Sequence, residues 1–296
     1  MPTRIALIGP GAIGGAVAAH LSTCENLEIN LAARTRFAEL LLESSEAEPR
    51  HIPARFLAAT DQPAPFDWML IATKAYDVAG TAPWLATLVG PNTRVAVLRN
   101  GVEHRERFQS LVPAAQLLPV MVDLPASRLA SGHIRQHGRG VLRVPDGDIG
   151  EAFCTLFAGT SIDAATVNDF TTCVWRKLTL NAPGAVNALL LQPTRIVAAP
   201  AVANLIRGLM REAIAVGRAE GAVLGNELIE AVITGMRQAP PDSVNSLHAD
   251  RRDGRPMETD ARNGAIVRFG RRHGIPTPLN AMAVTLLEAG AANCGR

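Results

Sequence analysis

The chain has 296 residues, more than a single domain usually contains, which favours two domains. It is 48% hydrophobic and 19% charged, as expected of a globular protein, and its one Tyr and three Trp disfavour an aromatic platform for nucleic acid. Its formal net charge of +2 requires no polyanionic partner, so we expect no nucleic acid and a small-molecule ligand instead.

The first half of the chain alternates short apolar runs with helical patterns, which is typical of consecutive βαβ units and a parallel sheet. We predict strands over residues 3–8, 27–33, 66–73, 93–98 and 116–122. We predict helices, each about as long as a right-handed crossover needs, over residues 12–22, 35–45, 77–89 and 102–110. A further strand within residues 51–60 has little support.

The pattern changes after Leu124. Two short runs, 133–136 and 141–144, are separated by His-Gly-Arg-Gly and predict an antiparallel hairpin added to the parallel sheet. One more strand is expected over residues 162–168. From there on the patterns are helical, over 170–191 with a break at Pro183-Gly184, 201–221 after Pro200, 226–238, 256–273 and 278–292.

These elements predict an α/β fold class, in which an N-terminal Rossmann-type doubly wound, mostly parallel sheet precedes an all-helical C-terminal domain. We place the two domains at residues 1–168 and 169–296. The helical domain carries an apolar stripe that fits a homodimer contact and an internal core equally well, formed by Val202, Leu205, Ile206 and Leu209.

No segment predicts a secretory leader or a membrane span, because the chain enters a strand at once and no apolar run reaches roughly 18 residues. The cysteines are widely spaced, without a C-x-x-C pair or histidines at zinc spacing, so we expect neither a redox motif nor a metal site. They are Cys24, Cys154, Cys173 and Cys294. We therefore expect a cytoplasmic protein with reduced cysteines.

A G-x-G-x-x-G turn follows the first strand and opens an Ala-rich helix, which is the arrangement that dinucleotide binding requires. The first glycine permits the tight turn, the second lets the backbone approach the pyrophosphate, and the third allows the helix to pack on the strand. The alternative is a plain glycine turn. The predicted cofactor-binding residues here are Gly9, Pro10, Gly11, Ala12, Ile13 and Gly14.

Arg34 stands at the end of the second strand, about 20 residues further on, where an NAD enzyme usually presents a carboxylate to the adenosine ribose. A guanidinium suits a 2′-phosphate, so the sequence favours NADPH over NADH. The alternative is that Arg34 and Arg36 only begin a solvated helix.

Lys74 and Asn100 follow two predicted strands at their carboxyl ends, where ligands collect in open α/β sheets. In the helical half, Lys177 and Asn181 are four residues apart and share one helix face. Glu258 is expected to open a helix just after Pro256. Three of them have an ordinary alternative: Lys74 as a surface lysine, Asn100 as part of an Asn-Gly turn, and Glu258 as a favourable charge at a helix N-terminus.

Together these segments resemble the ketopantoate reductase (2-dehydropantoate 2-reductase) family over nearly the whole chain. The resemblance rests on the glycine turn, on Ala-Thr-Lys-Ala-Tyr-Asp, Arg-Asn-Gly-Val and Trp-Arg-Lys-Leu with the following Asn, and on the C-terminal Glu-Thr-Asp…Asn-Gly…Gly-Ile-Pro-Thr-Pro. It implies NADPH-dependent reduction of the C2 carbonyl of ketopantoate to give pantoate, in pantothenate biosynthesis. It also implies that Lys177 is the catalytic acid, that Glu258 orients substrate and ribose hydroxyls, and that cofactor and substrate are held by Lys74, Asn100, Asn181, Ser246 and Glu258.

One position departs from the family, which usually has a second Asn four residues after the one matching Asn181, where this chain has Ala185. Either Asn187 takes over that substrate contact or the contact is missing. A buried hydrogen bond left unmade costs about 1 to 3 kcal/mol, enough to change the preferred 2-oxo acid. The alternatives are therefore an NADPH-dependent reductase of another 2-oxo acid or imine, and a non-catalytic NADPH sensor.

Overall fold

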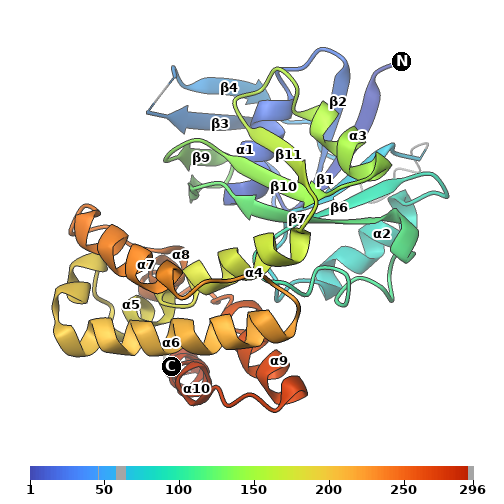
Figure 1. Ribbon diagram of the computed structural model, residues 1–296. Helices are drawn as coiled ribbons and strands as arrows, with labels where there is room; N and C mark the ends of the chain where they lie inside the picture. Colours follow the sequence, from blue (N-terminus) through green and yellow to red (C-terminus); the bar gives the residue numbers. More distant parts are fainter. Residues whose placement is uncertain (46, 58–64, 293–296) are drawn as a thin grey trace. The chain divides into compact units, whose positions relative to one another are not determined.

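The computed structural model describes residues 1–45, 47–57 and 65–292 and divides into two compact units (Figure 1). The first unit comprises Met1–Arg99 and His104–Phe170, and the second comprises Asn100–Glu103 and Thr171–Arg296. The segment Asn100–Glu103 thus groups with the C-terminal unit, although it directly follows a strand and Arg99 of the first.

The first unit is built on a seven-stranded sheet, as far as the described residues go, with the order β11-β10-β7-β6-β5-β1-β2. Neighbours are parallel from β2 to β7, through β2 (Leu27–Ala32), β1 (Thr3–Ile8), β5 (Trp68–Ile71), β6 (Arg94–Leu98) and β7 (Leu117–Asp123). Next, β10 (Val141–Pro145) runs antiparallel to β7, and β11 (Asp163–Val167) runs parallel to β10. The strands predicted for the parallel sheet and the one predicted at 162–168 are confirmed.

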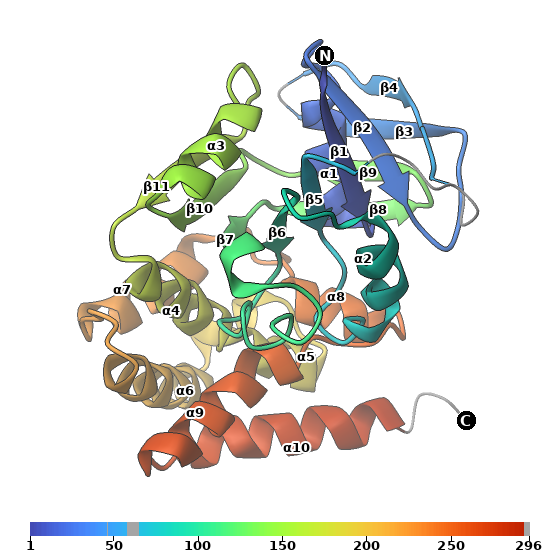
Figure 2. The same cartoon turned by 90° about the vertical axis from the view of Figure 1, so that its right-hand side faces the viewer.

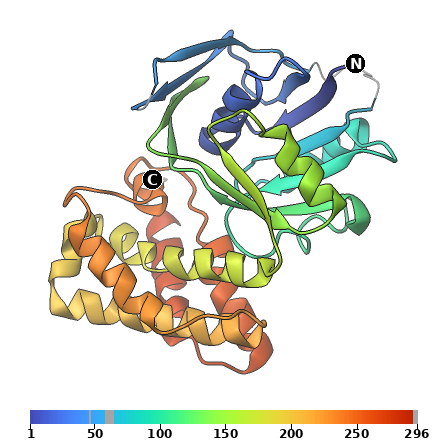
Figure 3. The same cartoon turned by 45° about the horizontal axis from the view of Figure 1, so that its top comes forward.

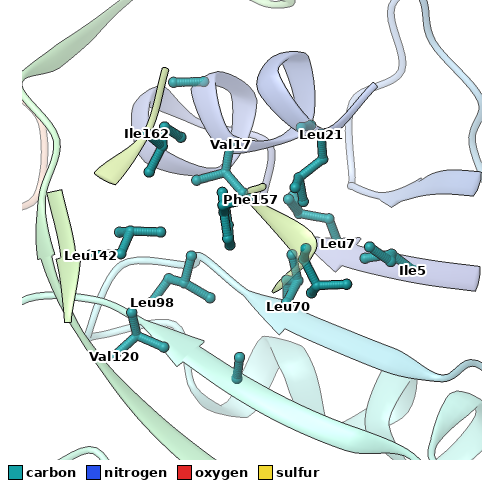
Figure 4. Close-up of a cluster of buried hydrophobic side chains, with 14 of the residues drawn as sticks. Ile5, Leu7, Val17, Leu21, Leu70, Leu98, Val120, Leu142, Phe157 and Ile162 are labelled. Carbon is teal, nitrogen blue, oxygen red and sulfur yellow. The ribbon is translucent and has the colours of Figure 1, made fainter. Parts of the chain in front are cut away.

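Both faces of this sheet are covered, because successive side chains of a strand point to opposite faces. Ile5 and Leu7 of β1 pack with Val17 and Leu21 of α1 (Ala12–Leu21) and with Phe157, which follows α3 (Asp148–Leu156) (Figure 4). On the other face, Ala6 and Ile8 join a cluster that includes α2 (Ala82–Leu88), preceded by the short 3-10 helix η1 (Ala79–Thr81). This double cover confirms the predicted doubly wound α/β class.

A second, four-stranded sheet was not predicted, and it overturns the helix expected at 35–45. Its order is β4-β3-β9-β8, formed by β3 (Glu39–Ser44), β4 (Arg50–Pro53), β8 (Ala126–Ala130) and β9 (His133–Gln136). Its blue strands, β3 and β4, lie next to its green ones in Figure 3. Leu40 and Leu42 are buried whereas Glu39 is exposed, so the burial follows the two-residue period of a strand. A run of leucines fits either period, and pairing with β4 and β9 decides it. β4 is the strand that had little support, and residues 58–60 of its predicted range lie outside the described residues.

The hairpin predicted from residues 133–144 is wrong, because its two strands belong to different sheets. β9 pairs with β8 and β3, whereas β10 pairs with β7 and β11. The backbone N–H of His137 donates to the carbonyl of Pro125, so the chain leaves β9 toward the start of β8. The glycines between the runs therefore connect two sheets.

The helix predicted at 102–110 is also wrong, since this stretch forms turns that lead to the 3-10 helix η2 (Ala114–Gln116). Phe108, whose ring is fully buried, bonds back to Arg105 and accepts from Val112, but no helix continues from these bonds. The preceding residues 100–103 pack with the other unit, which removes the first turn that a helix would need. The helix α3 was missed altogether.

The second unit is helical, as predicted. Its helices are α4 (Phe170–Asn181), α5 (Gly184–Leu190), α6 (Pro200–Ala219), α7 (Glu227–Gln238), α8 (Ser246–Arg252), α9 (Ala265–His273) and α10 (Pro278–Ala292), with a 3-10 helix η3 (Thr194–Ala198). The predicted break near Pro183 is confirmed, and α6, α9 and α10 lie side by side (Figure 2). Ile206 and Leu209 are buried within the chain, so part of the apolar stripe serves an internal core.

The helix predicted from residue 256 begins later. Residues 255–258 belong to no helix or strand, Asp260–Gly264 form a π-helical turn, and α9 follows. Glu258 therefore does not open a helix, which is a correction of the prediction. The physical reason is that Glu258 and Arg262 are both buried and bonded to other segments, and a widened turn is a common way of aiming side chains at a functional site.

Among the described residues, no helix is both long and apolar enough to cross a membrane, and no group of three His, Cys, Asp or Glu side chains is placed to hold a metal ion. Cys24, Cys154 and Cys173 are free thiols of intermediate burial. Cys294 lies outside the described part of the chain.

Candidate functional site

The glycine turn at the end of β1 has the geometry that its pattern predicts. Gly9 has a φ of +84°, and a Cβ added there would lie 2.8 Å from the Thr73 methyl group. A Cβ on Gly14 would lie 2.3 Å from the carbonyl oxygen of Gly9, so only glycine fits. At Gly11 the corresponding space is open to 4 Å. The first and third glycines therefore permit close packing, and the second leaves one side of the turn accessible to a ligand.

This turn lies at the switch point of the sheet, where β1 is flanked by β2 on one side and β5 on the other. Helix α1 begins after Gly11 without a side-chain cap and has no acidic residue in its first turn. The first backbone N–H groups of α1 therefore suit an anion bound at the start of the helix. Pro10 is buried, whereas Ala12 and Ile13 are partly exposed.

Arg34 lies beyond β2 and forms an ion pair with Asp77, 3.1 Å from guanidinium nitrogen to carboxylate oxygen. Its side chain is 88% exposed, so most of the guanidinium is open to a ligand. Asp77 belongs to a turn after β5 in which its N–H donates to the carbonyl of Lys74, whose side chain is half-buried. The helix required by the alternative explanation of Arg34 does not form, since residues 34–38 form no helix and a strand begins at Glu39.

In the second unit, Lys177 and Asn181 lie one turn apart on α4, and both are half-buried. The same helix buries Val174, Trp175 and Leu178, which fix its orientation in the helical unit. Lys177 is thereby held at the edge of a packed helix rather than on a fully exposed face.

Asn100 is brought to Glu258, although 158 residues separate them in sequence. Its amide donates to the Glu258 carboxylate at 3.1 Å, and Glu258 is only 5% exposed. The segment Asn100–Glu103 is held by Arg268, which donates to both carboxylate oxygens of Glu103. Gly101 has a φ of +100°, and a Cβ there would lie 2.7 Å from the carbonyl oxygen of Ala261. Close packing of this turn therefore places Asn100.

Asn181 and Ser246 are joined by a residue that the sequence analysis missed, Arg262. Its Nη1 donates to the Ser246 hydroxyl at 3.3 Å, and its Nη2 donates to the Asn181 carbonyl at 2.5 Å. Burial lowers the pKa of Arg262 to about 10, while the charges of Glu258 and Asp250 act in the opposite direction. The sequence held a weak signal, namely an arginine that follows Ala261 and closely precedes Gly-Ala-Ile in Asp-Ala-Arg-Asn-Gly-Ala-Ile.

Asn187 is placed differently from the other predicted substrate ligands. It is 2% exposed, its amide nitrogen donates to the Gln192 carbonyl, and its amide oxygen accepts from Asn245. These bonds give Asn187 a role in holding α5 beside the start of α8. A substrate contact by Asn187 stays a prediction, and the fully buried Ala185 offers no polar group in its place.

Comparison with known proteins finds relatives that match both units of the chain. The family models "Ketopantoate reductase PanE/ApbA" and "Ketopantoate reductase PanE/ApbA C terminal" match residues 5–148 and 169–291. The chain is 51% identical over 289 residues to a 2-dehydropantoate 2-reductase of Caulobacter vibrioides, covering 98% of this chain and 99% of that protein. It is 38% identical over 290 residues to one of Mycobacterium tuberculosis, covering 98% of each. A crystal structure of 2-dehydropantoate 2-reductase from Geobacter metallireducens has a TM-score of 0.89 at 26% identity, covering 97% of this chain and 99% of that one.

Proposed function

The chain belongs to the ketopantoate reductase family, and we propose from this premise that it reduces ketopantoate (2-dehydropantoate) to pantoate with NADPH, a step of pantothenate biosynthesis. The observation that carries the proposal is the polar cluster of the helical unit. Asn100 bonds to Glu258, and Arg262 joins Asn181 to Ser246. Four of the residues that the family resemblance implicates in binding are thus gathered from distant parts of the chain.

The first unit fits the cofactor. The open side of Gly11 and the uncapped start of α1 suit a pyrophosphate, and the exposed guanidinium of Arg34 suits a 2′-phosphate. Lys74 follows β5 at the same switch point and would add a cation near the phosphates or ribose. When bound, NADPH supplies the hydride that reduces the carbonyl carbon.

Lys177 is proposed as the general acid. Its ammonium donates a hydrogen bond to the C2 carbonyl oxygen, stabilises the negative charge that develops there, and transfers its proton to that oxygen to complete the hydroxyl. Glu258, held by the Asn100 amide, accepts hydrogen bonds from hydroxyl groups of substrate or ribose. Ser246 and Asn181 bind the polar end of the substrate.

A second candidate is reduction of another 2-oxo acid, and one observation favours it. Ala185 is fully buried and takes the place where the family usually has an Asn, so a hydrogen bond to the ketopantoate hydroxyl is absent at this position. A smaller or more apolar 2-oxo acid loses less from this substitution.

The function is tested by NADPH oxidation with a panel of 2-oxo acids. We expect the highest kcat/KM with ketopantoate, and a value no better than that for pyruvate would contradict the proposal. Substitution Lys177→Met should lower kcat by about 10²- to 10⁴-fold and leave NADPH binding, measured by cofactor fluorescence, unchanged. Arg176→Ala is the control, because Arg176 is the exposed neighbour on the same helix and should retain full kcat. Tight NADPH binding without turnover of any 2-oxo acid would indicate a sensor instead.

The homodimer and the cytoplasmic location stay predictions. A dimeric ketopantoate reductase from Staphylococcus aureus shares the fold at 22% identity, with a TM-score of 0.87. Sedimentation velocity of the purified chain, with a mass near twice its 31.3 kDa, would support the dimer.

A further inference from the structure

Arg262 is the most deeply buried charge of the polar cluster, with 3% of its surface exposed. It lies in the π-helical turn Asp260–Gly264, close to Gly184, where an added Cβ would lie 2.8 Å from its Nη2. Its Nε atom is buried without a hydrogen-bond partner among the described residues. Burying an arginine in this way costs free energy, because the guanidinium loses its hydration. Packing of one turn does not explain why the chain keeps a charge here.

The bonds of Arg262 go to the two segments that carry predicted substrate ligands. Nη2 holds the carbonyl of Asn181, the last residue of α4, and Nη1 reaches the hydroxyl of Ser246, the first residue of α8. Asp250 and Glu258 add negative charge around it, and its pKa of about 10 keeps it cationic at neutral pH. Arg262 is therefore a fixed positive charge behind Ser246.

The direction of the bond to Ser246 decides what that hydroxyl can do. A guanidinium only donates, so the Ser246 oxygen must accept from Arg262, and the hydroxyl proton must point elsewhere. Ser246 is exposed, so its proton is available to a ligand in solution. A hydroxyl held in this way is a hydrogen-bond donor, polarised by the cation behind it, and it suits a carboxylate.

We propose that Arg262 is a positioning residue that makes Ser246 a donor to the carboxylate of the 2-oxo acid. The inference rests on the proposed function. It concerns the acid group of the substrate, whereas the Asn missing at position 185 concerns the ketopantoate hydroxyl. Because Arg262 acts through Ser246, it determines the KM for the 2-oxo acid rather than the binding of NADPH.

The test is a double-mutant cycle with Arg262→Met and Ser246→Ala, measured as kcat and KM for ketopantoate and as the Kd for NADPH. We expect each single substitution to raise KM by about 10- to 100-fold with little change in Kd for NADPH. The double variant should have a KM no higher than the worse of the two single variants. Additive effects, or an unchanged KM in Arg262→Met, would overturn the inference. Arg262→Lys, which keeps a donor and the charge, should recover part of the loss.

Two further variants separate positioning from folding. Arg251 on α8 donates to the carbonyls of Ala188 and Leu189, so Arg251→Met removes a comparable link between α5 and α8. It should lower the unfolding temperature but leave KM unchanged. If Arg262→Met does not fold, Gly184→Ala takes its place, because the added methyl displaces the guanidinium without removing it. It should raise KM in the parent and have no effect in Ser246→Ala.

The two hypotheses fail differently. A parent protein that does not oxidise NADPH with ketopantoate overturns the proposed function, and with it the inference. An active parent in which Arg262→Met or Gly184→Ala leaves KM unchanged overturns the inference alone.

Discussion

At the scale of one residue, Arg34, proposed to bind the 2′-phosphate of NADPH, is at once paired and exposed. The guanidinium is tied to Asp77 at 3.1 Å and yet remains 88% exposed. The ion pair links the turn after β2 to the turn after β5, so Asp77 limits where the guanidinium lies. The pair itself contributes little to stability at such exposure. Its value is in orientation, since a phosphate dianion competes well with one carboxylate for the same donors.

We therefore predict that Arg34→Ala raises the Kd for NADPH by about 10- to 100-fold, because charge-assisted bonds to the 2′-phosphate are lost. The Kd for NADH should change little, since NADH has a hydroxyl at this position. Both constants can be measured by fluorescence titration. Arg36→Ala is the matched control, because Arg36 donates to the Leu57 carbonyl and should affect neither cofactor selectively. An equal loss for both cofactors would refute the role of Arg34.

At the scale of the element, the sequence predicts best where one period is unambiguous. The parallel strands are short apolar runs, and the helices α6 and α7 have strong amphipathic patterns and clear ends, such as Pro200 at the start of α6. The strand β3 was mistaken for a helix because Leu40 to Leu42 fit both periods. Its pairing with β9 joins Leu42 to Ile134, about 90 residues away, which no local pattern reveals.

In the candidate site, too, local motifs could be predicted from the sequence whereas contacts between distant residues could not. Gly9 to Gly14 are local in sequence, and their geometry follows from the motif. Arg262 was missed because its partners, Asn181 and Ser246, are distant in sequence and because the π-helical turn changes the face on which it lies. Family resemblance supplied Ser246 and Glu258, whereas the contact that joins Ser246 to Asn181 required the folded chain.

The turn after β6 gives a prediction at this scale. Gly101→Ala places a methyl group 2.7 Å from the Ala261 carbonyl oxygen at a φ of +100°, so the turn must move away from the loop that carries Glu258. We expect a higher KM for ketopantoate and a loss of stability of about 1 to 3 kcal/mol, measured by steady-state kinetics and denaturant unfolding. Gly254→Ala is the control, since Gly254 also has a positive φ, +64°, but a Cβ added there would meet no atom within 4 Å. It should lose some stability and retain KM; equal KM values in both variants would contradict the role of the Asn100 turn.

At the scale of the whole molecule, the stability of the chain depends on buried groups that must stay uncharged. His20, in the last turn of α1, bonds through Nε2 to the Gln136 oxygen of β9 at 2.8 Å. Its Nδ1 lies 3.2 Å from a guanidinium nitrogen of Arg50 in β4. Gln136 also donates to the Gly138 carbonyl, so its oxygen faces His20. The neutral ring thus donates through Nε2 and accepts at Nδ1, and it ties α1 to the second sheet.

Protonation of His20 would place an N–H against the Arg50 guanidinium, and burial, followed by the charge of Arg50, lowers the pKa of this histidine below 6.5. In acid the unfolded chain therefore binds a proton that the folded chain does not, so this contribution to stability is present above pH 6.5 and is lost as the pH falls below it. We predict that the unfolding temperature of the parent declines between pH 7 and pH 5 more steeply than that of His20→Gln, whose side chain keeps an acceptor and a donor but does not titrate. His248, whose pKa is also lowered by burial, remains in both proteins and supplies the common part of the decline. Parallel pH profiles, measured by circular dichroism in matched buffers, would show that His20 is not the group responsible.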